Sequence, residues 1–298
     1  MRHPRAQPVL AYPARAAIFL VLTVRPGGQH QVAETLDGLG ALTRAVAAGG
    51  LTCVAAVGAE LWDRLWPGPR PVGLEPLRSI AGLVHTAVAT PGDLLFHLRG
   101  DRLTACTELA YQLLERLAGA VDVADRVSGL RRQDGDPDLP QLGDELDNPA
   151  GLDAVSAVQV GAEDPDHAGG SYVLVQRYRH DLAEWRSLPG TGQDPAARNG
   201  PAARRIVRDA LPITTAGSDE VGSYLIAYAS SAGALDRMLR DRFVGDASGR
   251  TDPALRFSTA VTGGLFFVPT RDRLQGSATG WRHNHHGIRR AVPAGPAQ

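Results

Sequence analysis

Short apolar runs and helical stripes alternate along the first half of the chain. The run from Ile18 to Val24 is rich in aliphatic and β-branched residues, which predicts a buried strand. Between Val32 and Val46, apolar residues recur every three or four positions, which is the spacing of one helix face. The pattern continues with strands expected at 51–57, 93–98 and 121–127, and with a second helical stripe over 103–117. The predicted order is strand, helix, strand, strand, helix, strand.

The second half repeats this order in its pattern, although not in its letters. Residues 172–178 alternate as in a half-buried strand, and Asp181 is a suitable N-cap for a short helix over 181–188. Further strands are expected at 206–211, 221–229 and 260–268, with one helix face formed by Leu235, Met238, Leu239 and Phe243.

Two β-α-β-β-α-β units predict an α+β protein. It would consist of two ferredoxin-like domains, each an antiparallel sheet with helices on one face. We place the N-terminal domain at residues 8–128, the C-terminal domain at 129–272 and a mobile tail at 273–298. Stretches rich in Asp, Pro, Gly and Ala predict loops at 131–153 and 189–203.

Composition narrows the class of protein without pointing to a function. The 298 residues are 43% hydrophobic and 21% charged, with a net charge of −1, which gives no sign of binding to nucleic acid or to an anionic membrane. No apolar run approaches the ~20 residues of a membrane span. The run 16–22 could imitate a signal peptide, but Arg and Pro follow it, and we interpret it as a core strand. Two cysteines, Cys53 and Cys106, imply no disulfide framework and fit a reducing, cytoplasmic compartment.

Six short strings occur in one order across roughly residues 10–272. They are TPGDLLFH at 90–97, GGSYV at 169–173, QRYRHDL at 176–182, FVGD at 243–246, FSTA at 257–260 and GLFFVP at 264–269. In this order they resemble the strings of bacterial dye-decolorizing peroxidases, the DyP family. The resemblance implies a pair of ferredoxin-like domains of the DyP and chlorite dismutase-like type. It also implies heme b in the C-terminal domain and the oxidation of small organic substrates by hydrogen peroxide.

The resemblance further implies two catalytic residues on the peroxide side of the heme. Asn148 and Pro149 match a pair that follows the family's catalytic Asp, which places that residue at Asp144, although the glycines around it are replaced. The segment RIVRDA at 205–210 resembles the one that carries the family's Arg, which is Arg208 here. A carboxylate can relay a proton between the two peroxide oxygens, and a guanidinium can stabilise the charge that develops as their bond breaks. The residues alone also allow a simpler interpretation, in which Asp144 belongs to a solvated acidic loop.

The iron side departs from the family pattern. The resemblance places the axial His before the strand with Arg208, where residues 188–201 contain no histidine. The carboxylate expected to orient that ligand is replaced by Arg256. The family resemblance thus implies heme b, whereas the lack of an axial His argues against it. We assign no metal ligand. We assign Arg208, Phe266 and His180 as cofactor contacts; His180 matches a family position other than the ligand and is otherwise a structural histidine.

The sequence is compatible with three functions. Because one of them is not enzymatic, the sequence does not decide whether the protein is an enzyme. The first is a DyP-type peroxidase whose iron is held in another way. The second is a heme-free pseudoenzyme that acts as a binding or assembly partner, pairing with an intact paralogue. The third is a non-heme enzyme that reuses a pocket rimmed by Arg208, Arg256 and apolar residues near Phe266, which would suit an anionic, partly apolar ligand.

The tail and the family suggest further partners. Relatives form oligomers, so a homo-oligomer is expected. Residues Gly287 to Arg290 faintly resemble the C-terminal tails that load some relatives into encapsulin shells. Nearby, His283, His285 and His286 could bind a metal, but a free tail cannot hold a defined geometry, and we favour a stretch without a metal site.

Overall fold

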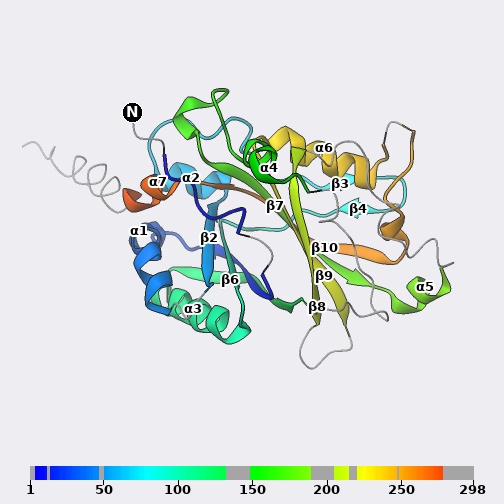
Figure 1. The fold of residues 1–298 in the computed structure, drawn as a ribbon, viewed down its shortest axis with the longest axis horizontal. Coiled ribbons are helices and arrows are strands. Elements are labelled where there is room, and N and C mark those ends of the chain that lie inside the picture. Colours follow the sequence, from blue (N-terminus) through cyan, green and yellow to red (C-terminus); the bar gives the residue numbers. More distant parts are fainter. Residues whose placement is uncertain are drawn as a thin grey trace, which may run out of the picture.

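Both halves of the chain fold as a strand-helix-strand-strand-helix-strand unit (Figure 1). The computed structural model describes residues 4–11, 14–46, 50–131, 148–188, 205–214, 220–246 and 248–277. The N-terminal half contains β1 (Ala16–Val24), α1 (Gln29–Val46), β2 (Thr52–Val57), α2 (Ala59–Leu65), the short strands β3 (Ile80–Ala81) and β4 (Thr86–Ala87), β5 (Leu94–Gly100), α3 (Leu103–Arg116) and β6 (Val121–Leu130).

The C-terminal half follows the same order with one helix added before it and one after it. It contains α4 (Gly151–Val158), β7 (Ser171–His180), α5 (Leu182–Ser187), β8 (Val207–Thr214), β9 (Val221–Ala229), α6 (Ala232–Phe243), β10 (Ser258–Val268) and α7 (Arg271–Gln275), with 3-10 turns at Pro165–His167 and Pro253–Arg256.

The two antiparallel sheets join edge to edge into one closed barrel. Strand order is β6-β1-β5-β2 in the N-terminal half and β10-β7-β9-β8 in the C-terminal half, which is the ferredoxin-like order in both. The sheets meet where Val57 of β2 pairs with Phe267 of β10, and where Gly129 of β6 pairs with Ile213 of β8. The predicted α+β class with two ferredoxin-like units is confirmed. The closure into a barrel is an addition to it, and the domain boundaries at 8–128 and 129–272 stay a prediction.

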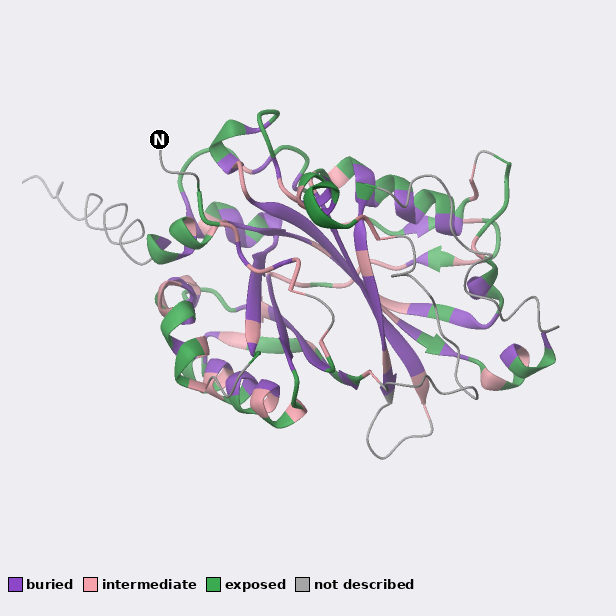
Figure 2. Ribbon diagram, in the orientation of Figure 1, coloured by how far each residue is buried: buried purple, intermediate pink, exposed green. Residues whose placement is uncertain are grey.

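Apolar side chains fill two layers, one inside the barrel and one between the barrel and its helices. Because successive strand residues point to opposite faces, neighbours such as Phe266 and Phe267 belong to different layers. Figure 2 shows the consequence: most of the long strands are buried along most of their length, with β6 as an exception, whereas the helices are exposed on their outward sides. Burying one such side chain stabilises the fold by roughly 1.5–3 kcal/mol.

Predictions that depend on residues close together in the sequence are confirmed. Asp181 caps α5, with its Oδ1 accepting hydrogen bonds from the amides of Ala183 (2.9 Å) and Glu184 (3.0 Å). Cys106 is a free, buried thiol on the inner face of α3.

The loop predicted at 131–153 is wrong at its end, because α4 begins at Gly151. That helix is short and has no side-chain cap, so its sequence carries a weak start signal.

Candidate active site

Arg208 lies near the start of β8, and Asn148 fixes its backbone. The Asn148 side chain donates from Nδ2 to the Arg208 carbonyl (2.7 Å) and accepts at Oδ1 from the Arg208 amide (2.8 Å). The two bonds attach Asn148, just before α4, to the start of β8. They resemble the pair of backbone hydrogen bonds that a residue of a neighbouring strand would make. The Asn-Pro pair served in the sequence only as a landmark for Asp144, so this bridging role of Asn148 was missed.

Arg208 points to the outer face of the C-terminal sheet. On β8, Val207, Leu211 and Ile213 pack inside the barrel. The alternate residue Ala210 packs on the other side in a small cluster. Arg208 shares the face of Ala210, since residues two apart on a strand point the same way. The cluster that neighbours it consists of Trp185, Leu188, Ala210, Ala254 and Phe257.

His180 reaches this same outer face from the end of β7. Its Nδ1 lies 2.8 Å from the hydroxyl of Ser258, and its ring lies 5.8 Å from the ring of Phe257. Only 7% of His180 is exposed. The hydroxyl of Ser258 therefore sets the orientation of the imidazole ring.

Two buried polar groups on this face lack a partner among the described residues. Tyr178 donates its hydroxyl to Gln176 Oε1 (2.5 Å), whereas Gln176 Nε2 makes no hydrogen bond there. Ser223 Oγ, on the neighbouring strand β9, is buried and makes none either. Buried polar groups are nearly always bonded in folded proteins. The face is thus suited to a bound group that offers hydrogen-bond acceptors.

Arg208, Arg256 and Phe266 do not line a common pocket, contrary to expectation. Phe266 points into the barrel, where it packs with Val175, on the face opposite to Ala210 and Arg208. Arg256 lies on the surface, with 62% of its side chain exposed, and its Nη2 is 3.8 Å from Glu184 Oε1. Arg208 and His180 therefore share one face of the C-terminal sheet, although they lie apart along it: Arg208 pairs with Ala227, and Ala227 pairs with Leu174, six residues before His180. Phe266 lies on the opposite face, and this placement does not favour its assignment as a cofactor contact.

Several predicted residues lie outside the described part of the chain. Asp144 falls in the gap at 132–147, and the interval expected to hold the axial ligand, 188–201, falls in the gap at 189–204 except for Leu188. The tail histidines, His283 to His286, follow the last described residue. Within the described ranges, no group of three or more His, Cys, Asp and Glu side chains is arranged to hold a metal ion.

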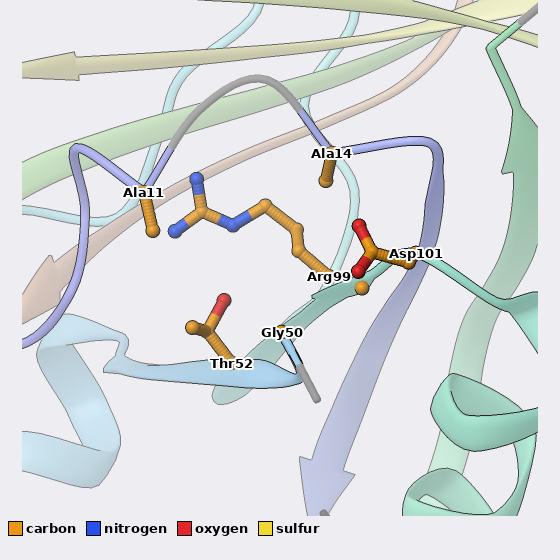
Figure 3. A pocket seen from close by; sticks show the side chains of 7 residues that line it. Ala11, Ala14, Gly50, Thr52, Arg99 and Asp101 are labelled. Carbon is orange, nitrogen blue, oxygen red and sulfur yellow. The ribbon is translucent and has the colours of Figure 1, made fainter. Parts of the chain in front are cut away.

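A cavity of about 230 Å³ beside Arg99 belongs to the N-terminal half (Figure 3). Arg99 is 1% exposed and donates to the backbone carbonyls of Val9 (3.3 Å) and Pro8. Figure 3 shows its guanidinium extended toward Ala11, away from Asp101. Because Arg99 donates to backbone carbonyls of the N-terminal segment, it attaches that segment to the barrel. Nothing in the apolar pattern of β5 signals this role.

Known families and structures resemble the chain over almost its whole length. Residues 6–131 match the family described as Dyp-type peroxidase, N-terminal, and residues 137–197 and 193–273 match Dyp-type peroxidase, C-terminal. A dye-decolorizing peroxidase of Mycolicibacterium paratuberculosis is 42% identical, covering 90% of this chain and 84% of its own. The encapsulated DyP-type peroxidase of Mycobacterium smegmatis has a TM-score of 0.84 at 40% identity, covering 91% and 98%. A DypB variant of Rhodococcus jostii RHA1 in complex with heme has a TM-score of 0.82 at 36% identity, covering 91% and 97%.

Proposed function

This chain belongs to the Dyp-type peroxidase family, and from that premise we propose that it oxidises small organic substrates with hydrogen peroxide when heme is bound to its C-terminal half. The observation that carries the proposal is the pair of hydrogen bonds between Asn148 and Arg208. They fix the backbone of Arg208, whose side chain lies on the outer face of the sheet, and they attach to it Asn148, four residues after Asp144. This arrangement supports a site that uses both of the family's catalytic residue types.

The described residues of this face fit a heme group. Gln176 Nε2 and Ser223 Oγ are buried and unbonded within the described ranges, so both can bond acceptor atoms on the rim of a cofactor. Arg208 would act on the peroxide. Bound heme would supply the redox chemistry toward peroxide, which side chains alone do not provide.

His180 is our candidate for the residue that holds the iron. The sequence has no histidine between His180 and His283, so the family's usual position is not available. The hydroxyl of Ser258 lies 2.8 Å from His180 Nδ1 and can fix the ring with its Nε2 as the ligand nitrogen. Ligand histidines commonly have such a partner on the second ring nitrogen.

Arg208 and Asp144 are our candidates for the chemistry at peroxide. The Arg208 guanidinium would stabilise negative charge on the departing oxygen, and the Asp144 carboxylate would carry the proton from one oxygen to the other. Asp144 precedes Asn148 by four residues, and four residues of chain span at most about 14 Å. The hydrogen bonds of Asn148 therefore limit how far Asp144 can lie from Arg208.

The test is an absorption spectrum of the purified full chain, as isolated and during titration with hemin. We expect a Soret band that saturates at one heme per chain and peroxide-dependent oxidation of a dye by the loaded protein. His180→Ala should abolish or shift the band, whereas His85→Ala should leave it unchanged. A spectrum no different from that of free hemin would overturn the proposal and leave the heme-free pseudoenzyme as the better interpretation. A normal band in His180→Ala would reject His180 as the ligand.

We also propose a mode of assembly and a cellular compartment for this chain. The encapsulated relative supports packaging of this chain in an encapsulin shell, with residues 287–290 as the loading signal. Co-expression with a shell protein should give co-purified cargo for the full chain and none for a chain truncated after residue 280. The two free, buried thiols support a reducing, cytoplasmic compartment. No described helix has the length and apolar character needed to cross a membrane.

A further inference from the structure

A second and larger cavity, of about 410 Å³, lies on the inner side of the barrel. Its walls come from β1, β6, β7, β9 and β10 and from the segment before β5, so both halves of the chain contribute. Pro91 and Ala124 are exposed at its rim, whereas Tyr224 and Phe266 are buried. This size suits a small organic molecule.

Two buried polar atoms of the cavity wall have no hydrogen-bond partner among the described residues. One is the hydroxyl of Tyr224, whose residue is 0% exposed and whose ring stacks on Phe19 with centroids 4.1 Å apart. The other is Oδ2 of Asp125. An unbonded buried polar atom costs roughly 1–3 kcal/mol, and folded proteins have few of them. Two in the wall of one cavity make it suited to a polar guest.

The charges around the cavity favour a neutral guest. Burial raises the pKa of Asp125, and Arg177, whose Nη1 lies 3.5 Å from Asp125 Oδ1, opposes this as a counter-charge to the carboxylate. Arg177 Nη2 also lies 3.7 Å from Glu220 Oε2. Burial raises the pKa of Tyr224, so its hydroxyl keeps its proton and can donate. A single hydroxyl group on the guest can donate to Asp125 and accept from Tyr224.

The rest of the wall is apolar and aromatic. Phe266 is 1% exposed, and Val21 and Val175 lie beside it. Gly264 allows the Phe266 ring to lie against its own strand, since a Cβ there would lie 2.7 Å from Phe266 Cε2. A Cβ on Gly92 would likewise lie 2.8 Å from Val21 Cγ1. A flat ring can therefore pack against Phe266 while its substituent reaches the polar pair.

We propose that this cavity is a binding site for a small neutral aromatic molecule with one hydroxyl group, such as phenol or benzyl alcohol. The hydroxyl donates to Asp125 Oδ2 and accepts from Tyr224, and the ring packs against Phe266. The site lies inside the barrel, on the other side of the C-terminal sheet from Arg208, and it needs neither heme nor peroxide. It is thus a second site, separate from the proposed peroxidase site.

Isothermal titration of the full chain with phenol tests the proposal, with toluene and benzylamine as comparison ligands. We expect saturable binding of phenol at one site and binding of toluene that is at least fivefold weaker, because toluene lacks the hydroxyl. Tyr224→Phe and Asp125→Asn should each weaken phenol binding by about fivefold to tenfold. Tyr228→Phe is the matched control, since it removes a buried barrel hydroxyl that does not line the cavity, and it should leave the affinity unchanged.

Each other outcome contradicts the proposal. Absence of saturable phenol binding would mean that the cavity holds water only. Equal affinity for toluene would remove the role of the polar pair, and tighter binding of benzylamine would mean a site for cations. Loss of phenol binding in Arg208→Ala would place the ligand on the outer face instead. Because the expected result does not depend on hemin, failure here and failure of the peroxidase proposal are distinguishable.

Discussion

His97 and Tyr228 meet inside the barrel, with the imidazole Nδ1 2.8 Å from the tyrosine hydroxyl. His97 belongs to β5 and Tyr228 to β9, so this hydrogen bond joins the two halves of the chain. Both residues are buried, His97 at 1% and Tyr228 at 0% exposure. Phe19 stacks on His97 on one side and on Tyr224 on the other, with centroids 4.7 and 4.1 Å apart. A polar pair thus sits within an aromatic row that spans the barrel.

Removing the Tyr228 hydroxyl should destabilise the fold. In Tyr228→Phe the ring packing is kept but the buried His97 Nδ1 loses its partner, so we expect a loss of about 1–3 kcal/mol in the free energy of unfolding. Urea denaturation measures it. Tyr111→Phe is the control, because Tyr111 is 59% exposed and should change stability by less than about 0.5 kcal/mol. Equal effects in the two variants would argue against the hydrogen bond as a stabilising contact.

His97 should also make stability depend on pH. Burial lowers the pKa of His97 well below its ordinary value, and the charge of Arg99 lowers it further. Near pH 6.5 the unfolded chain then binds a proton that the folded chain does not bind. The contribution of His97 to the free energy of unfolding is therefore complete above pH 6.5 and is lost as the pH falls below this value. Because of this residue, we expect the free energy of unfolding to fall by up to about 1.4 kcal/mol per pH unit below pH 6.5. His97→Asn keeps a polar group near Nδ1 but does not titrate, and urea denaturation between pH 7.5 and 5 should show a flatter dependence.

The pattern of apolar residues predicts the elements well because each strand and helix must bury one face. It predicts the relation between the elements less well. The barrel closes through single pairings between residues that are far apart in sequence, such as Val57 with Phe267, and no local signal encodes them. The resemblance to a known family supplied the fold class that the repeat alone only suggested.

Which face of the sheet each candidate residue occupies could be predicted only in part, for a similar reason. Arg208 and His180 do share one face of the sheet, as their even spacing from neighbouring residues on each strand allows. Phe266 and Phe267 stand in one apolar run, and a register shift between Ala260 and Thr262 precedes them. A shift of one residue exchanges the faces of a strand, so the sequence could not tell which phenylalanine points outward.

Two glycines should respond to alanine in opposite directions. A Cβ on Gly263 would lie 2.1 Å from the backbone oxygen of Val88, so Gly263→Ala must push apart β10 and the segment that follows β4. We expect the free energy of unfolding to fall by more than about 2 kcal/mol, since the backbone of Val88 cannot move aside as a flexible side chain can. Gly40 lies exposed within α1 with only the end of the Arg44 side chain nearby (3.5 Å), so Gly40→Ala should stabilise the fold by roughly 0.5–1 kcal/mol. Thermal unfolding of both variants measures the two signs.

Asn148 should act on the peroxide reaction through Arg208. In Asn148→Ala both hydrogen bonds to the Arg208 backbone are lost, and we expect the rate constant for the reaction of the hemin-loaded protein with peroxide to fall about tenfold or more. Arg208→Leu should lower it by roughly 10²–10³, because the guanidinium itself is removed. Asn148→Asp keeps the acceptor for the Arg208 amide and should fall between wild type and Asn148→Ala. Stopped-flow mixing with peroxide measures the rates, and the Soret band and melting temperature show whether heme and fold are retained. A normal rate in Asn148→Ala, with heme bound, would mean that Arg208 is positioned by other contacts; a normal rate in Arg208→Leu would remove it from the catalytic residues.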